Sequence, residues 1–498
     1  METMSSKLIN SAYFLVFAKL LQRSIGLVSL LILARLLSPQ DFAVAAIISM
    51  TIYFFDVLSN VGNEQYIIQK AEIVDDDLNT AWTLSLIIKL TISLLLFCLI
   101  PLIDSYYEEL PLTTVLFAAT LILPINALCN PGMFQLQRDL DYRKIFYLSV
   151  IQKIISFAFV ILVVSFEPTY WALVIGDVVG ALVLLLGSYK IHDFRPKFCL
   201  SNANLQWFSS KWILGKNILG YLRSQVDTFI VSRLFNSATL GRFYLTRDIA
   251  MLPSQNLLTP LIQPLLAAFS RNGQDPDKLA KQLDLSLIVI TSIVIPIVIY
   301  IWQFPEPIID TLLGEKWIEN YQLMSVMSLL VLYIPFVLLF EQILMATGRF
   351  KHVFYFDMLS LIFIFCGLLL LQNGNIVDFA ALRGILGMVA TLSLAAYLFR
   401  FIRYSLSNWL MILILTVISA MLAAQLAQTL IASYDWQPIF ELLLSGGLFV
   451  TVYALLMLLV LKLSAPYNHN MAKVLSLLSV QLSNLSKKIR KNSENQAN

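Results

Sequence analysis

The sequence contains little charge. Only 13% of its 498 residues are Asp, Glu, Lys or Arg, whereas soluble domains average about 25%. Hydrophobic residues make up 58% of the chain, which excludes a soluble globular protein and predicts a membrane protein. The formal net charge of +3 is nearly neutral, so we expect no binding of nucleic acid.

Cysteine and histidine are also scarce. The four cysteines include no CxxC pair and the three histidines lie far apart in polar connections: Cys98, Cys129, Cys199 and Cys366, and His192, His352 and His469. These spacings predict neither a disulfide framework nor a metal site. The sequence shows no Gly-rich phosphate loop and no nucleophile–base pair, so we expect neither a cofactor nor an enzyme.

Long polar stretches are rare as well. A helix needs about 20 apolar residues to cross a bilayer, and this criterion predicts an all-α polytopic membrane protein with about 14 transmembrane helices. The first span is too long for a signal-peptide core and no small-residue cleavage site follows it, so we expect it to be retained. The expected spans are 10–34, 42–64, 80–103, 111–133, 145–166, 169–189, 211–234, 242–268, 283–304, 322–347, 351–372, 376–399, 408–431 and 438–462.

Basic residues gather in every second connection. If the N-terminus is cytoplasmic, the inside segments hold 22 Lys and Arg residues and the outside segments hold 4. This asymmetry follows the positive-inside rule and predicts that both termini are cytoplasmic. The segment Met471–Lys491 mixes apolar residues with a basic cluster and predicts an interfacial amphipathic helix on anionic membrane lipids. A disordered tail is the alternative interpretation.

The chain also repeats itself. The turn Ala34–Ala43 after the first span matches Ser232–Gly241 after the seventh, 198 residues further on. After spans four and ten, Arg143–Tyr147 matches Lys351–Tyr355 at an offset of 208. Because each half has an even number of spans, we predict two parallel six-helix repeats that form two lobes around a central cavity. The expected parts are a lobe at 1–189, a cytoplasmic linker at 190–210, a lobe at 211–400, two extra helices at 401–463 and a cytoplasmic tail at 464–498.

Charged side chains inside two apolar spans are the candidate binding residues. Lys19 and Arg23 share one face of the first span, and Lys216, Arg223 and Asp227 share one face of the seventh. A guanidinium at the bilayer centre costs at least about 2.5–3.5 kcal/mol, so it persists only beside a partner or a watery cavity. The two spans are equivalent in the repeat, and we predict that their cations meet at the lobe interface and bind an anion such as pyrophosphate. The alternative is an internal pair in which Asp227 serves only to hold Arg223.

Other buried charges have two interpretations each. Asp56 could pair with Arg23 or Lys19 across the lobe. Arg247 either enters the cavity as a further substrate contact or reaches the outer interface by snorkelling. The same choice between pathway residue and snorkelling side chain applies to Lys89 and Lys153.

Glycines and prolines mark close packing and bends. Gly384 and Gly387, beside Arg383, would let another helix approach closely. Asp177 lies in a GxxxG segment that favours helix packing, with a proton or sodium site as the alternative. Span eight holds three prolines that predict a bend, either static or a hinge for alternating access: Pro253, Pro260 and Pro264.

Together these features resemble a known family. The two six-helix halves, the turn Arg35–Phe42 and the segment Arg138–Arg143 resemble the polysaccharide-transporter family, the Wzx-type flippases of bacterial surface polysaccharides. The resemblance is to the colanic-acid and O-antigen-type exporters in particular, and it covers spans one to twelve. Their superfamily also includes the MATE multidrug exporters and the lipid II flippase.

The resemblance implies V-shaped lobes with a central cationic cavity in the bacterial inner membrane. It implies that the protein moves an undecaprenyl-pyrophosphate-linked oligosaccharide from the cytoplasmic to the outer leaflet. Coupling to protons or sodium, and contact with the polysaccharide polymerase machinery, would accompany that activity. A MATE-like drug or cation antiporter, or a lipid II-type exporter, is the alternative, but basic residues outnumber acidic ones at mid-span and favour an anionic substrate. A polymerase or ligase would need a large outside loop, and the longest outside connection, Phe304–Tyr321, is short.

Overall fold

The described chain is built from helices alone. The computed structural model describes residues 4–464, except 61, 71, 108–109, 140, 202, 274, 372–373 and 432–435. Within these residues no strand occurs, which confirms the predicted all-α class. The predicted amphipathic tail, and with it Met471–Lys491, lies outside the described residues.

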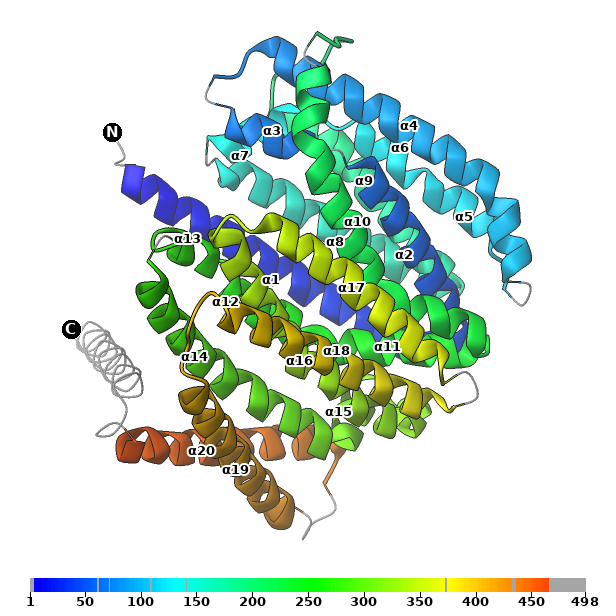
Figure 1. The fold of residues 1–498 in the computed structure, drawn as a ribbon. Coiled ribbons are helices and arrows are strands. Elements are labelled where there is room, and N and C mark those ends of the chain that lie inside the picture. Colours follow the sequence, from blue (N-terminus) through cyan, green and yellow to red (C-terminus); the bar gives the residue numbers. More distant parts are fainter. Residues whose placement is uncertain are drawn as a thin grey trace, which may run out of the picture. The chain divides into compact units, whose positions relative to one another are not determined.

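The chain divides into two compact units. The first is Met1–Leu245 with Asp357–Ile376, and the second is Thr246–Phe356 with Val377–Asn498. Compactness and internal repetition are different criteria, so the lobes at 1–189 and 211–400 stay a prediction. The first unit contains α1 Met4–Leu36, α2 Pro39–Ser59, α3 Asn63–Gln69, α4 Asp75–Tyr106, α5 Thr113–Thr120, α6 Ile122–Ala127, α7 Gly132–Arg138, α8 Tyr142–Phe166, α9 Trp171–Ile191 and α10 Ala203–Leu234 (Figure 1).

The described part of the second unit is also built from helices. Two helices, α11 Ser237–Pro253 and α17 Phe350–Leu369, begin in one unit and end in the other. The remaining elements are the π-helix η1 Ser254–Leu258, α12 Thr259–Ile262, α13 Leu265–Ser270, α14 Pro276–Gln303, α15 Pro305–Leu312, the 3₁₀ helix η2 Glu315–Asn320, α16 Tyr321–Ala346, α18 Ile376–Phe399, α19 Leu406–Ile431 and α20 Pro438–Ser464.

Ten described helices are long and apolar enough to cross a membrane, or up to eleven with one bent pair. The expected spans that hold Arg23, Arg223 and Arg247 are not among them. The count of fourteen therefore stays a prediction.

Two expected spans are not single helices. The segment 111–133 is divided into Thr113–Ala127 and Gly132–Arg138, bent by 64°, with Pro131 at the break. The segment 242–268 is divided into α11, η1, α12 and α13, with breaks at the prolines that predicted a bend. Proline lacks an N–H and its ring displaces the preceding turn, so the helix cannot continue unchanged through it. The bend predicted at the prolines of span eight is confirmed, whereas the break in 111–133 was not expected from the sequence.

The two turns that match in sequence are capped in the same way, while their equivalence in a repeat stays a prediction. The Ser38 side chain accepts a hydrogen bond from the Asp41 backbone N–H at 3.2 Å, at the start of α2. At the start of α11, the Asn236 side chain accepts from the Thr239 N–H at 2.8 Å. The two capping residues, Ser38 and Asn236, are 198 residues apart in the sequence. The last residues of α1 and α10 are separated by the same number. Side-chain oxygens satisfy the N–H groups at a helix start that have no partner within the helix, so the same local chemistry begins both helices.

The two capped turns also touch each other. A Cβ placed on Gly241 would collide with the backbone carbonyl of Pro39, so the α11 backbone lies directly on the first turn of α2. Only glycine fits this contact without a shift of the backbone. The contact brings together two segments that match in sequence, within the first unit.

Gly241→Ala is expected to destabilise the first unit by about 1–3 kcal/mol, since a methyl group is forced against backbone atoms. Gly220→Ala is the matched control, because a Cβ at Gly220 meets no atom within 4 Å and alanine favours a helix by up to about 1 kcal/mol. Thermal unfolding of the purified protein in detergent should show a lower Tm for the first variant only. A rise in Tm for both would contradict the contact.

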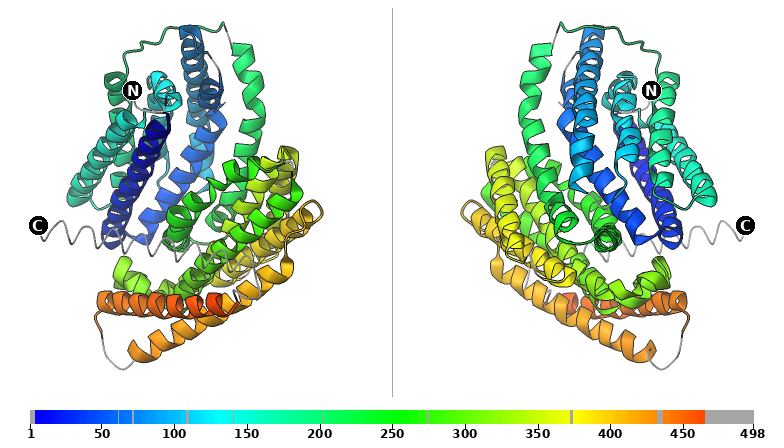
Figure 2. Two further views of the ribbon diagram at one scale, coloured as in Figure 1. Left: turned by 90° about the vertical axis from the view of Figure 1, so that its left-hand side faces the viewer. Right: turned by 90° about the vertical axis from the view of Figure 1, so that its right-hand side faces the viewer.

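A short linker crosses the end of the first unit between α9 and α10 (Figure 2). It is held on α4, where Asn79 Oδ1 accepts from the Lys197 N–H at 2.8 Å and Thr83 Oγ1 accepts from the Cys199 N–H at 3.0 Å. Because α10 begins at Ala203, the helix starts earlier than the expected span at 211. The linker is therefore an ordered strap on the first unit over its described residues.

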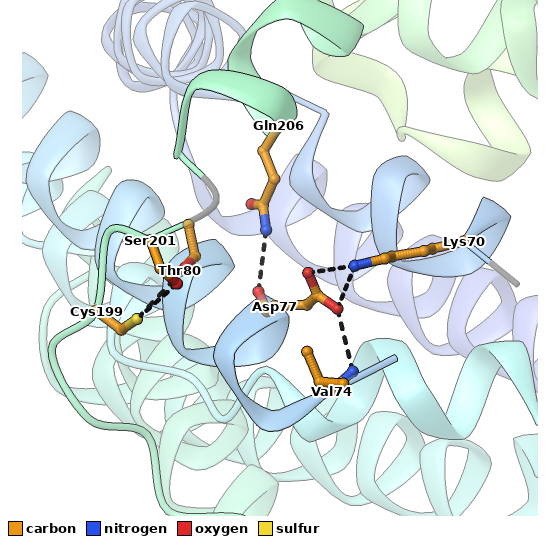
Figure 3. A network of polar contacts seen from close by, with 7 residues as sticks. All are labelled: Lys70, Val74, Asp77, Thr80, Cys199, Ser201 and Gln206. Atoms are coloured by element: carbon orange, nitrogen blue, oxygen red, sulfur yellow. Dashed lines mark hydrogen bonds and ion pairs between the residues drawn. The ribbon is translucent and has the colours of Figure 1, made fainter. Parts of the chain in front are cut away.

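Figure 3 shows the polar network under this strap. The buried Asp77 carboxylate accepts from Lys70 Nζ at 2.6 and 2.7 Å and from the Val74 N–H at 3.1 Å, which caps α4. Gln206 of α10 donates to the Asp77 carbonyl at 3.1 Å. The hydrogen bond to Asp77 raises the pKa of Lys70 above its usual value, so the contribution of the Lys70 charge to stability is present at neutral pH and is lost as the pH rises through that raised pKa.

Small residues hold the second unit together. Along α19, Ala420, Ala424 and Ala427 are fully buried against a cluster that includes Ile295 of α14 and Phe449 of α20. Small side chains let helices approach closely in a bilayer, where apolar surface alone gives no driving force between them. The two expected extra helices are thus packed directly onto α14.

Candidate functional site

An ion pair in the first unit is the centre of the candidate site. Arg223 of α10 places Nε 3.2 Å from Asp357 Oδ1 of α17. The Asp357 side chain is 3% exposed and that of Arg223 is 20% exposed. A guanidinium offers five N–H donors in a planar fork, so one such side chain can bind more than one anionic oxygen.

Asp357 was missed by sequence reasoning, which considered Asp227 as the partner of Arg223. Asp227 is fully buried one turn along α10, and its Oδ1 accepts from the Thr228 N–H at 2.8 Å. The signal that could have found Asp357 was its position as an isolated carboxylate in the apolar span 351–372. The same criterion had selected Arg223.

The other predicted cations are distributed over different elements. Lys19 and Arg23 are exposed on α1, and Lys216 is half-buried on α10. A Cβ at Gly26 of α1 would lie 3.6 Å from Lys153 Cε of α8, so a further cation lies against α1. The helix α1 packs on α8, whereas α10 packs on α2. That the cations of α1 and those of α10 meet in one cavity therefore stays a prediction.

Arg247 belongs to the second unit and is half-buried, directly before Asp248. Its role as a substrate contact therefore stays a prediction too. Among the described residues, no group of three or more His, Cys, Asp or Glu side chains is placed to hold a metal ion.

Asp56 has a different partner from the one expected. Its Oδ1 lies 3.0 Å from Lys89 Nζ, so the carboxylate of α2 is paired with α4 and the expected pair with Arg23 or Lys19 is corrected. The reason is packing: α2 lies against α4, whereas α1 lies against α8. The sequence left Lys89 as either a pathway residue or a snorkelling side chain. In the structure its ammonium group is paired with Asp56.

The close approach predicted at Gly384 and Gly387 is confirmed. A Cβ at Gly387 would overlap the Tyr333 ring of α16, and one at Gly384 would press on Leu329. This contact places the buried Arg383 beside Tyr333, and its Nη1 donates to the Tyr333 hydroxyl at 2.7 Å.

An apolar pocket of about 940 Å³ lies in the first unit and is lined in part by α10 and α17, the two helices that carry Arg223 and Asp357. Side chains of α2, α4, α10 and α17 line it, among them Phe55, Leu222 and Ile362. Leu222 is the neighbour of Arg223 in the chain, so the pocket and the cation share α10. The Tyr221 hydroxyl donates to the Met50 carbonyl at 2.5 Å and ties α10 to α2 beside the pocket.

The arrangement suits an amphiphilic anion. A guanidinium forms strong charge-assisted hydrogen bonds with phosphate oxygens, and a largely apolar pocket of this volume takes a hydrocarbon chain. A small soluble ion would need no such pocket, and a neutral lipid would need no cation.

Comparison with known proteins identifies the family. The model of the family described as polysaccharide biosynthesis protein matches residues 32–322, more than half of the chain. The chain belongs to this family. Among curated members, the lipopolysaccharide biosynthesis protein WzxC of Escherichia coli (strain K12) is 24% identical over 338 residues, 66% of this chain and 68% of that protein. The succinoglycan biosynthesis transport protein ExoT of Rhizobium meliloti (strain 1021) is 24% identical over 301 residues, and the aligned part spans 60% of this chain and 61% of ExoT.

Comparison with solved structures shows that the chain has a known fold. The lipid II flippase MurJ in an inward closed conformation matches with a TM-score of 0.73 and 14% identity, over 90% of this chain and 98% of MurJ. An inward-facing multidrug transporter of the MATE family matches with a TM-score of 0.59 and 13% identity, over 76% of this chain and 93% of that one. The chain therefore has the fold of these multi-pass membrane transporters.

Proposed function

We propose that the protein flips a lipid-linked oligosaccharide of a bacterial surface polysaccharide, carried on undecaprenyl pyrophosphate, from the cytoplasmic to the outer leaflet. The observation that carries the proposal is the Arg223–Asp357 pair on α10 and α17, two helices that also line an apolar pocket of about 940 Å³. The guanidinium would hold pyrophosphate oxygens, and the pocket would hold part of the isoprenoid chain. Family membership and the fold support the same activity.

The remaining candidate cations extend this proposal. Lys19, Arg23, Lys216 and Arg247 would line the path of the pyrophosphate, with Asp227 beside Arg223 as a charge partner. Alternating access would expose this path first to the inside and then to the outside. The broken segment from α11 to α13 would serve as the hinge, because its prolines already lack the backbone hydrogen bonds that resist bending.

The proposal includes the setting of the activity. We place the protein in the bacterial inner membrane with cytoplasmic termini, with a proton or sodium ion as the coupling ion and the polymerase machinery as the downstream partner. A MATE-like exporter of cations would require an anionic site, whereas the candidate site described above contains an arginine on α10.

Deletion of the gene tests the function. Lipid-linked repeat units are expected to accumulate on the cytoplasmic leaflet of the inner membrane, and the wild-type gene supplied in trans should remove them. The measurement is the extraction of lipid-linked glycans after labelling of spheroplasts with a membrane-impermeant reagent that reports the exposed leaflet. If the lipid-linked units reach the outer leaflet equally in the deletion strain, the proposed function is wrong.

A further inference from the structure

A second pocket, of about 490 Å³, lies in the second unit, away from the candidate site. It forms where α14 ends and α15 begins, beside the start of α16 and between the facing ends of α19 and α20. Its volume is within the range of about 300–1,000 Å³ that is typical of small-molecule sites.

The side chains around this pocket combine rings with acids and amides. Trp302, Tyr321 and Trp436 supply aromatic surface, and Trp302 and Trp436 are 51% and 40% exposed. Glu306 and Glu441 add two carboxylates. A saccharide presents both C–H faces, which pack on aromatic rings, and hydroxyl groups, which donate to carboxylates. Few other ligands use both kinds of surface in so small a volume.

Two glutamines complete the polar part. Gln303 Nε2 donates to Gln428 Oε1 at 2.6 Å, which joins the end of α14 to the end of α19. Each amide keeps a further polar atom, and a side-chain amide both donates and accepts. These groups match the hydroxyls of a sugar, which also donate and accept.

The backbone fixes the position of one ring. The Ser325 hydroxyl donates to the Trp302 carbonyl at 3.2 Å and ties α16 to the end of α14. Pro305 and Pro307 are buried at the start of α15, immediately after the Trp302–Phe304 segment. Proline fixes φ, so the chain that presents Trp302 loses little freedom on binding.

Charge places the pocket on the outer face under the predicted orientation. At its end of the second unit lie Glu306, Asp310, Glu315, Glu319 and Glu441, with Lys316. The opposite ends of the same helices carry basic residues: Lys278, Lys281, Arg349, Lys351, Arg400, Arg403 and Lys462. By the positive-inside rule, the basic end is cytoplasmic and the pocket faces outward.

Two simpler explanations fit less well. Tryptophans at a membrane interface often serve as anchors in lipid, but an anchor does not require two carboxylates and two amides around the same space. A hard cation such as Ca²⁺ takes six to eight oxygen ligands, and it would make no use of three aromatic rings.

We propose that this pocket binds a saccharide on the outer face of the membrane. The ligand is either the glycan of the flipped lipid-linked unit or a segment of the finished polysaccharide, which share this chemistry. The identity of the glycan rests on the proposed function, whereas the binding of a saccharide by this pocket does not. The pocket gives α19 and α20, which lie outside the predicted repeat, a role of their own, because it is lined by Gln428 of α19, Glu441 of α20 and Trp436 of the connection between them.

Calorimetric titration of the full-length protein in detergent tests the proposal. The probes are the repeat-unit oligosaccharide released from its lipid by mild acid, the purified surface polysaccharide of the same host, and CaCl₂. Saccharide binding is expected, and Trp436→Ala and Glu441→Gln should each weaken it at least tenfold. The probe that binds more tightly identifies the source of the glycan.

Two matched variants serve as controls. Phe440→Ala removes an exposed aromatic ring beside Glu441 that does not line the pocket, and Glu315→Gln removes an exposed carboxylate at the same end of the unit. Both should bind the saccharide as the wild type does. The proposal is overturned if neither saccharide binds, if only Ca²⁺ binds, or if Trp436→Ala and Phe440→Ala behave alike.

The test separates this pocket from the proposed function. Arg223→Glu should bind the saccharide normally while export is lost. If lipid-linked units reach the outer leaflet equally in the deletion strain and the saccharide still binds, then the proposed function fails and the pocket stands. If saccharide binding is absent while export depends on Arg223, the pocket proposal fails alone.

Discussion

Arg223→Glu is expected to reduce export of the surface polysaccharide by about 100-fold or more. The change removes the cation and sets a second carboxylate against Asp357, which lies 3.2 Å from Arg223. Loss of one partner from a buried, hydrogen-bonded charge pair costs about 2–5 kcal/mol, and about 1.4 kcal/mol corresponds to a factor of ten. Export is measured as cell-surface polysaccharide, normalised to the amount of the protein in the membrane.

A charge swap separates a substrate role from a structural one. In the double variant Arg223→Asp with Asp357→Arg the pair is kept and its direction is reversed, so thermal stability should return toward the wild-type value. Export should stay at least tenfold low, because the cation has moved from α10 to α17. Full recovery of export would mean that Arg223 only holds helices together. Lys278→Glu, at an exposed pair with Asp275, is the control and should export normally.

Ile362→Trp is expected to reduce transport about tenfold. Ile362 lines the apolar pocket from α17 and is 52% exposed, so an indole there occupies space proposed for the isoprenoid chain without disturbing a buried core. Phe363→Trp is the matched control: Phe363 is 43% exposed on the same helix and does not line the pocket.

The initial rate of flipping in proteoliposomes with the lipid-linked oligosaccharide is the measurement for this pair. Both variants should have the Tm of the wild type. Equal rates for Ile362→Trp and the wild type, or equal losses in both variants, would remove the pocket from the transport path.

Local chemistry was predictable from the sequence. The turns before α2 and α11 were recognised from a ten-residue match, and both prove to be capped at equivalent positions because capping depends on residues three apart. The all-α class followed from apolar runs, which depend on composition along one segment. The close approach at Gly384 and Gly387 was likewise visible in the spacing of two glycines.

Partners between helices were not predictable in the same way. Arg223 was selected correctly as a costly charge, but its ion pair with Asp357 depends on how α10 packs against α17. The pairing of Asp56 with Lys89 depends on α2 and α4 in the same manner. A single sequence shows that such a charge needs a partner, and only the packing shows which residue supplies it.

The hydropathy criterion also could not show whether an expected span is one unbroken helix. Hydropathy counts apolar residues and does not register a change of direction, so 111–133 passed as one span although Pro131 stands at a 64° bend. The two pockets depend on side chains from four or five elements each, and no single segment carries their signal.

The contact between Gly241 and Pro39 bears on how the chain can evolve. Each residue belongs to one of two turns that match in sequence, and the two turns rest on one another, so a change in one turn alters the surroundings of the other. The two turns are therefore not free to diverge independently at this point. Comparison of many family members should show paired substitutions at positions 39 and 241.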